Sequence, residues 1–375
     1  MATEILNGEA AVAEGTALGP RRRNTNPGYL TRLAEAATLV NRAFNGNARA
    51  MLDLREAMST SDFPHLFGDV LDRELLAQYQ NLAPIWPQFA ARSLVRDFRP
   101  KKYFDLLGGR GVLDKVPQLG EYKARKMSDA EYELAVGKYG NRLPLSWETL
   151  INDDLDAFRD APQRIAQGAR DTEDYLATGL IASSAGPNTA FFADHGTFDN
   201  SVKHVVLDTD ALSAALTDIS SRRDSEGRPI MVSAAVLMVP PALEVAANNI
   251  LNATEIRNTV DGQTVLVGNW LSGRVKVVVN PWLPVVDTSA NSATSWYLLP
   301  APSTARPGLV VGFLRGHETP DLRVKADAGQ MVGGGAIPAE EGSFDNDDIQ
   351  YRVRHVLGGT TLDPIASYAS DGKPA

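Results

Sequence analysis

The clearest structural signal in the chain is the stretch NDDLDAFRDAPQRIAQGARDTEDYLATGLIASS, residues 152–184. Largely apolar positions recur in it every three or four residues, which is the period of one helical face: Leu155, Phe158, Ile165, Ala169, Thr172, Leu176 and Leu180. The other side carries Arg159, Arg164, Arg170, Glu173 and Asp174. Pro162 fits a first-turn position, so the helix is either kinked or restarted there. We predict a long amphipathic helix that ends near Ser184, with Gly186 and Pro187 as stop signals.

Downstream of this helix, the pattern predicts a compact α/β unit between Val205 and Pro284. Its expected parts are a strand at Val205, a helix over 210–221, a buried strand over 230–239, a helix over 241–253, and strands over 265–267 and 275–279. Further β segments are expected over 296–299, 309–314 and 349–356. In the last segment Ile349, Tyr351, Val353 and His355 fall on one face, and Gln350, Arg352 and Arg354 on the other.

Upstream of the long helix, the sequence predicts a polar hairpin within residues 100–146. One arm alternates Glu121, Lys123 and Arg125 with less polar residues, and the other arm contains Glu131 and Glu133 after a turn at Ser128–Asp129. Both faces are too polar to be buried, so the hairpin should project and serve as an interaction device.

The first hundred residues are predicted to be helical pieces that follow a mobile arm over residues 1–28. An amphipathic helix is expected from Tyr29 to Phe44, a second one running toward Met58, and a third over 69–80.

Composition narrows the classes of function. The 375 residues correspond to about two or three packed units. The formal charge of −9 disfavours a protein that wraps nucleic acid through its phosphates. The absence of cysteine excludes disulfides, cysteine-ligated metals and thiol catalysis. Residues 1–19 do not resemble a secretory signal, and the apolar stretch 230–243 is too short to span a bilayer, so we expect folding in a cytoplasm and no membrane span.

No motif predicts catalysis, a cofactor or a metal. His195 and His204 lie near Asp194 and Asp199, but their spacing and the Gly- and Asn-rich context favour a loop over a metal site. The glycines of 108–111 and 333–335 fit no nucleotide-binding pattern. Adjacent acids occur at Asp153–Asp154, Glu340–Glu341 and Asp347–Asp348, and they are typical of caps and turns. Arg21 to Arg23 is interpreted as a solvated arm and not as a DNA contact.

Residues 58–370 contain a set of short motifs in a defined order. They are Ser61-Asp62-Phe63-Pro64, Asp97-Phe98-Arg99-Pro100, Gly120-Glu121-Tyr122, Asn152-Asp153-Asp154-Leu155, Phe191-Phe192-Ala193-Asp194-His195-Gly196, and Val353-Arg354-His355 before Gly358-Gly359. In these motifs and in its order of elements the chain resembles the major capsid proteins of tailed phages with the Hong Kong 97 fold. The motifs are most similar to the branch that includes the Mu head protein and prohead protease–capsid fusions.

The resemblance implies an α+β capsid fold, with the parts in a fixed order. These are a mobile tail (1–28), a helical N-arm (29–99), an E-loop hairpin (100–146), a P-domain with its spine helix (147–204), an A-domain (205–290), and returning P-domain strands with the C-terminus (291–375). It implies a structural, non-enzymatic protein of the virion that assembles in the host cytoplasm, through hexamers and pentamers, into an icosahedral shell around double-stranded DNA. The implied partners are further copies of the chain, a scaffolding protein, a portal and, as an option, a decoration protein.

Within this resemblance, the N-arm and E-loop would clasp neighbouring subunits. Glu121, Lys123, Arg125, Glu131 and Glu133 become candidates for ion pairs between subunits. An isopeptide bond from Lys123 or Lys126 to Asn346 is set aside, because no motif aligns these residues as partners. Residues 1–57 are short for a removable scaffolding segment, which favours a retained N-arm or a separate scaffolding protein.

Two alternatives stay open. An encapsulin-type compartment would enclose protein cargo in place of a genome, and neighbouring portal and terminase genes would argue against it. More distantly, the unit over 205–284 could belong to an α/β enzyme with a ligand pocket, which would be a monomer or a small oligomer.

Overall fold

The computed structural model of the chain describes residues 27–44, 47–58, 63–106, 129–146, 161–196, 198–223, 229, 233–260, 263–304, 307–325 and 348–373. The chain divides into two compact units. We call residues 1–84, 137–172 and 313–357 the first unit, and residues 85–136, 173–312 and 358–375 the second unit.

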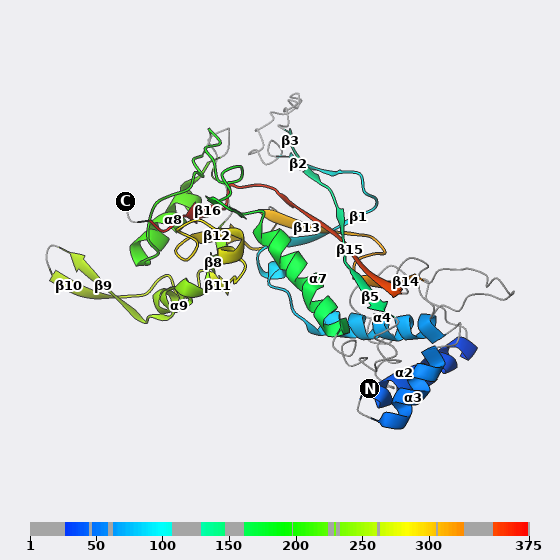
Figure 1. Cartoon of the computed structure of the whole chain (residues 1–375). Coiled ribbons are helices and arrows are strands. Elements are labelled where there is room, and N and C mark those ends of the chain that lie inside the picture. The colour runs from blue at the N-terminus through cyan, green and yellow to red at the C-terminus, as the bar shows by residue number, and fades with distance from the viewer. Residues whose placement is uncertain are drawn as a thin grey trace, which may run out of the picture. The chain divides into compact units, whose positions relative to one another are not determined.

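The predicted N-terminal helices are present in the first unit and lie close together (Figure 1). They are α2 (Pro27–Phe44), α3 (Ala48–Met58) and α4 (Phe63–Asn81). Their apolar faces meet in one buried cluster that includes Leu33, Val40, Leu54, Leu71 and also Tyr351 of β15 (Asp348–Thr361). The Asn47 side chain accepts hydrogen bonds from the backbone N–H groups of Arg49 and Ala50, which caps α3. The helices are therefore part of the core of this unit.

Strand β15 organises the sheet of the first unit. Its residues 348–357 pair antiparallel with β14 (Asp321–Lys325), β5 (Arg142–Ser146) and β4 (Gly137–Tyr139). The predicted alternation is confirmed at Tyr351 and His355, which are buried, and at Arg352, which is exposed, whereas Val353 and Arg354 are both half-buried.

The long helix is present as α7 (Ala161–Thr178), with Pro162 in its first turn, while residues 151–160 lie outside the described residues. Its predicted end near Ser184 is wrong. The helix stops at Thr178, and Ala182–Ser183 (β6) pairs with Gly186–Pro187 (β7) instead. Gly186 adopts a φ of 116°, a conformation that glycine tolerates, and this lets the chain reverse tightly after the helix.

The polar hairpin pairs differently from the prediction. Asp129 does not lie in a turn but begins strand β3 (Asp129–Leu134), which pairs antiparallel with β2 (Lys101–Leu106). The partner of β3 thus comes from the start of the 100–146 segment, and residues 107–128 lie outside the described residues. The register places Tyr103 opposite Tyr132, a cross-strand aromatic pair of the kind that stabilises sheets. We call β2 and β3 the β2–β3 arm.

The second unit contains a sheet in the order β11–β8–β12–β16 among its described strands. These are β11 (Lys276–Val279), β8 (Ala234–Val239), β12 (Trp296–Pro300) and β16 (Tyr368–Ser370). β8 and β11 are parallel, whereas β12 is antiparallel to β8 and to β16. β12 and β16 follow residue 290, whereas β8 and β11 precede it. The expected boundary between the A-domain and the returning P-domain strands at residue 290 therefore runs through this sheet.

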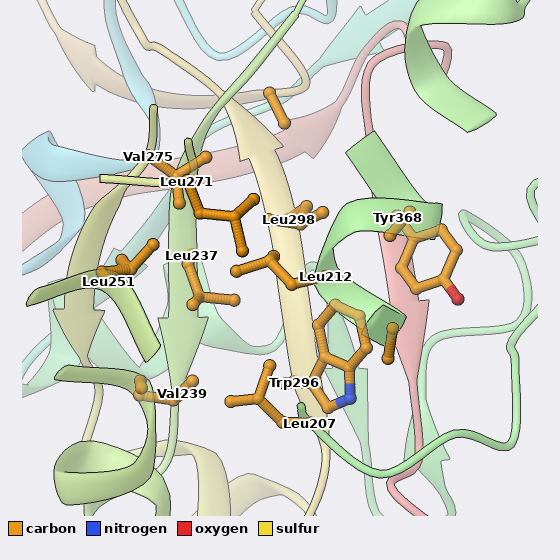
Figure 2. Packing of buried hydrophobic residues seen from close by; sticks show 14 of the residues in the cluster. Leu207, Leu212, Leu237, Val239, Leu251, Leu271, Val275, Trp296, Leu298 and Tyr368 are labelled. Carbon is orange, nitrogen blue, oxygen red and sulfur yellow. The ribbon is translucent and has the colours of Figure 1, made fainter. Parts of the chain in front are cut away.

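Helices cover this sheet and bury its apolar residues. They are α8 (Thr209–Ser221), the 3-10 turn η4 (Pro241–Leu243) and α9 (Glu244–Asn252), in agreement with the predicted positions. Figure 2 shows Leu212 of α8, Leu237 of β8 and Trp296 and Leu298 of β12 in the resulting core. The side chain of Asp208 accepts a hydrogen bond of 2.7 Å from the N–H of Ala211 and so caps α8.

Two strand predictions in this unit need correction. No strand lies at Val205, whose side chain is exposed. Its backbone N–H donates a hydrogen bond to the Ser370 hydroxyl. The predicted strand over 265–267 belongs to β10 (Gln263–Gly268), which pairs with β9 (Glu255–Val260) in a separate hairpin and not with the main sheet. The remaining described elements of the unit are the 3-10 turn η2 (Trp86–Gln88), β1 (Ala91–Val95) and α10 (Leu283–Val286). Strand β13 (Leu309–Leu314) begins in this unit, and its last two residues belong to the first unit. No helix in the described residues is both long and apolar enough to cross a membrane.

Candidate assembly surfaces

The last turns of α7 carry two buried carboxylates that hold a distant loop. Glu173 accepts a hydrogen bond of 2.8 Å from the indole N–H of Trp86. The carboxylate of Asp174 accepts the backbone N–H groups of Ile85 and Trp86 at 2.9 and 2.8 Å. Their exposed fractions are 0% and 6%, so their expected place on the polar side of the helix does not put them in solvent. Their burial is offset by the hydrogen bonds that both carboxylates accept there.

The end of α7 is also tied to the main sheet of the second unit. The Thr178 hydroxyl donates to the Asp174 carbonyl at 2.7 Å and accepts the Asn280 side-chain amide at 2.8 Å. Asn280 follows β11 directly and donates its own N–H to the Val239 carbonyl at the end of β8. This chain of buried hydrogen bonds fixes the helix end against the ends of two parallel strands.

In the first unit, α7 is held by Arg170. Its guanidinium donates to the Tyr79 carbonyl at 2.8 Å and lies 3.6 Å from the centroid of the Tyr79 ring. The planar guanidinium combines a hydrogen bond with a cation–π contact, and this combination favours arginine over lysine. The middle of α7 is thereby joined to the end of α4.

A surface groove of about 350 Å³ lies in the first unit between α7 and β15. Its lining residues include the exposed Arg142 and Arg164 and no acidic residue. Nearby, Arg354 holds Asp321 with two hydrogen bonds of 3.1 and 2.8 Å across the β14–β15 pair. Burial raises the pKa of Asp321, but the hydrogen bonds and charges of Arg354 and Arg323 outweigh it and hold the pKa below its usual value.

The β2–β3 arm presents charges at its surface and is fixed at its base. Lys102 and Glu133 form an ion pair of 3.8 Å, and both side chains are more than half exposed. At the base Leu134 is fully buried. A Cβ atom on Gly358 would lie only 2.0 Å from the Ala135 carbonyl oxygen, so the two backbones approach as closely as they do because residue 358 is glycine.

A protein-family model for phage capsid proteins matches residues 130–370, which is more than half of the chain. The chain belongs to the phage capsid protein family. The mixed helices and sheets described above confirm the predicted α+β class, and membership of the phage capsid family fits the predicted Hong Kong 97 type. It also identifies the chain as a structural component of the virion capsid. The more specific likeness to the Mu head protein stays a prediction.

Solved structures similar to this capsid protein include phage structures and an encapsulin complex. Gordonia phage Cozz is 15% identical with a TM-score of 0.43, covering 77% of this chain and 87% of that chain. The capsid of cyanophage P-SCSP1u is 12% identical with a TM-score of 0.45, covering 77% and 88%. The holo-SrpI encapsulin complex of Synechococcus elongatus is 13% identical with a TM-score of 0.42, covering 76% and 85%. No curated protein matches the chain.

Of the predicted contact residues of the capsid protein, Glu133 is placed on the surface, where it pairs with Lys102 of its own chain. The backbone of Glu131 lies in β3 and faces Phe104 in the register, whereas its side chain lies outside what the structure describes. Glu121, Lys123 and Arg125 fall outside the described residues, as do Lys126 and Asn346.

The histidines near Asp194 and Asp199 make separate contacts. His195 lies against the Phe198 ring with centroids 5.0 Å apart, and His204 contacts the Asp371 carboxylate at 2.8 Å. Hydrogen bonds from Lys203 and Ser201 lower the pKa of Asp199. Within the described ranges, no three His, Asp or Glu residues are grouped to hold a metal ion. The glycines of 108–111 and 333–335 and the acid pairs at 153–154 and 340–341 lie outside these ranges.

The sequence pattern missed the residues that fix α7. Pro84 and Pro87 mark the segment around Trp86 as irregular, but no spacing connects it to carboxylates 87 and 88 positions later. One signal in the sequence could have indicated their burial: Glu173 and Asp174 are adjacent and lie next to the apolar side of an amphipathic helix.

Proposed function

We propose that the chain is a major capsid subunit whose copies assemble through hexamers and pentamers into a closed icosahedral shell around double-stranded DNA. The observation that carries the proposal is the phage capsid family match over residues 130–370. Heterologous contacts between identical subunits must close into rings before a shell can form. The subunit acts by binding its own copies, and we assign it no catalytic role.

The predicted division into parts supplies roles for the proposal. Residues 100–146, which include the β2–β3 arm, would be the E-loop that reaches a neighbouring subunit. Residues 147–204 and 291–375 would form the P-domain with α7 as its spine, and residues 205–290 the A-domain around the ring axis. The exposed Glu133, together with Glu121, Lys123, Arg125 and Glu131, would form ion pairs with neighbouring subunits.

The helical N-terminal region supports a retained N-arm. Leu33, Val40 and Leu54 are buried with Tyr351, which belongs to the capsid family match. Removal of residues 1–57 would expose this core face, so a separate scaffolding protein fits better than a cleaved segment. A portal, and optionally a decoration protein, would complete the particle, and assembly would take place in the host cytoplasm.

The acidic character of the chain suits a shell that contains DNA. Packaged DNA has to slide along the inner wall, and strong nonspecific phosphate binding would hinder this movement. A net charge of −9 reduces such binding.

The contents of purified particles test the proposal. The protein would be expressed with its neighbouring head genes, and the fastest-sedimenting fraction would be treated with nuclease and then opened. Protected double-stranded DNA is the expected content. Shells that hold a single cargo protein and no DNA would indicate an encapsulin-type compartment and overturn the DNA part of the proposal.

A further inference from the structure

The β9–β10 hairpin is a sheet of two strands among the described residues, and Figure 1 shows it extending from the end of α9. Isolated two-stranded hairpins are marginally stable in water. The sequence of this hairpin nevertheless holds Ile256, Val260, Val265, Leu266 and Val267. The Leu266 side chain is 59% exposed. The hairpin therefore has apolar character and strand edges that a further binding partner would satisfy.

The base of the hairpin is rigidly anchored. The N–H of Asn269 donates to the Thr254 carbonyl at 3.1 Å, and its side-chain amide donates to the Ile250 carbonyl of α9 at 2.7 Å. Its side-chain oxygen accepts the N–H of Leu271 at 3.0 Å. These bonds set the direction in which the hairpin leaves the second unit.

A surface groove of about 300 Å³ lies beside this base. Its lining residues include Leu216, Thr217 and Ser220 of α8, Ala234 of β8, and Trp270 with Arg274. The Trp270 side chain is 50% exposed, and the Arg274 guanidinium lies 5.6 Å from its ring centroid. We call this the Trp270–Arg274 groove. Its lining combines an aromatic ring, two aliphatic side chains, three hydroxyl groups and one positive charge.

The hairpin cannot fill the groove of its own subunit. Six residue pairs of antiparallel strand extend about 20 Å. The far end of the hairpin is therefore distant from its own base, and the groove lies beside that base. The hairpin and the groove are different patches on one compact unit. A contact in which each copy inserts its hairpin into a different neighbour is heterologous, and repetition of this contact forms a ring when the rotation between copies closes.

We propose that the β9–β10 hairpin of one copy docks in the Trp270–Arg274 groove of a second copy. Charge supports this occupant: residues 255–268 contain Glu255, Asp261 and Arg257, hence a net charge of −1, whereas Arg274 is the charged residue of the groove. The exposed Leu266 side chain of the hairpin would pack on the Trp270 face and on Leu216. The inference deepens the proposed function, because it names a contact that joins neighbouring subunits in a ring.

Crosslinking tests the contact directly, because the chain has no natural cysteine. Gln263→Cys would place one thiol at the far end of β10, and Ser220→Cys one in the groove. Each single variant is assembled alone, and the two are also co-assembled. A double variant that carries both cysteines in one chain is assembled as well, and a short bismaleimide is then added to every sample. We expect covalent dimers in the mixture and a ladder up to the ring size in the double variant, but neither cross-link in either single variant. If Ser220→Cys fails to fold, Thr217→Cys replaces it in the same groove.

A second measurement compares two exposed aliphatic residues of the second unit. Leu266→Lys would bury a charge at the proposed contact and should lower the yield of assembled particles about tenfold or more. Val285→Lys, at a position that is 54% exposed on α10, should leave the yield near that of the wild type. Circular dichroism of the unassembled subunits checks that both variants fold.

The outcomes separate the two proposals. Suppose that the wild-type protein forms rings or shells, but the mixture of cysteine variants gives no cross-link and Leu266→Lys has an unchanged yield. This result would overturn the hairpin contact and leave the capsid function intact. A cross-link that forms within single subunits only would overturn it as well. Wild-type protein that forms no ring or shell would overturn the proposed function and the contact with it.

Discussion

The indole N–H of Trp86 donates a 2.8 Å hydrogen bond to the Glu173 carboxylate, and both side chains are almost completely buried. This bond joins a 3-10 turn to the long helix α7, while the neighbouring Asp174 receives the backbone N–H groups at the start of the same turn. The helix that dominates the sequence is thus held in the second unit by its acidic residues as well as by its apolar side.

Replacement of Glu173 should show how strong this attachment is. Glu173→Leu removes the acceptor and leaves the Trp86 N–H buried, so we expect a loss of about 2–3 kcal/mol in unfolding free energy. Glu173→Gln keeps an oxygen acceptor and should lose less. Urea unfolding of the subunit, followed by tryptophan fluorescence, measures both. Equal stability of Glu173→Leu and wild type would show that the bond contributes nothing.

Gly358 should not tolerate a side chain. A Cβ atom there would meet the Ala135 carbonyl oxygen at 2.0 Å, so Gly358→Ala must push the base of the β2–β3 arm away and should cost about 1–3 kcal/mol. Gly168→Ala is the matched control, because nothing lies within 4 Å of its Cβ position in α7. Alanine is a better helix former than glycine, so this control should gain about 0.5–1 kcal/mol. Thermal unfolding that lowers Tm for both variants alike would contradict the geometry.

The Asp321–Arg354 pair should make the first unit sensitive to acid. The folded-state pKa of Asp321 is below its ordinary value, so its contribution is complete above the unfolded pKa of about 4 and is lost as the pH falls toward the folded pKa. Asp321→Asn should therefore be less stable than wild type at pH 7 by about 1 kcal/mol, and the difference should shrink below pH 4. Denaturant unfolding across this range measures it. A difference that is constant with pH would refute the electrostatic origin.

Glu133 separates the stability of the subunit from its assembly. Its ion pair with Lys102 is exposed, so Glu133→Lys should change unfolding free energy by no more than about 0.5 kcal/mol. If Glu133 contacts a neighbouring subunit as proposed, the same variant should reduce particle yield. The double variant Lys102→Glu with Glu133→Lys restores the pair within the chain and serves as the control. Normal assembly of the single variant would remove Glu133 from the contact.

Elements with a strong local pattern were predictable from the sequence. The helical period from Tyr29 to Phe44 gives α2, and the apolar run that ends at Val239 gives β8, because burial on one face or on both faces leaves a direct mark in composition. The alternation of Tyr351 and Arg352 in β15 is readable for the same reason.

Features that depend on distant parts of the chain were not predictable in this way. The partner of β3 is β2, which is farther from it in the sequence than the predicted partner, the arm with Glu121, Lys123 and Arg125. The burial of Glu173 depends on a donor in Trp86, and polarity alone assigns this residue to solvent. The β9 strand carries Glu255, Arg257 and Asn258, so its pattern resembles a loop until β10 is placed beside it.

The central claim is that copies of this chain form symmetric capsomers and closed shells. Electron microscopy of the fastest-sedimenting fraction of the protein, co-expressed with its neighbouring head genes, tests it most directly. The account predicts class averages with five- and six-fold rings of subunits, within closed shells. A protein that stays monomeric or dimeric in every fraction would contradict it.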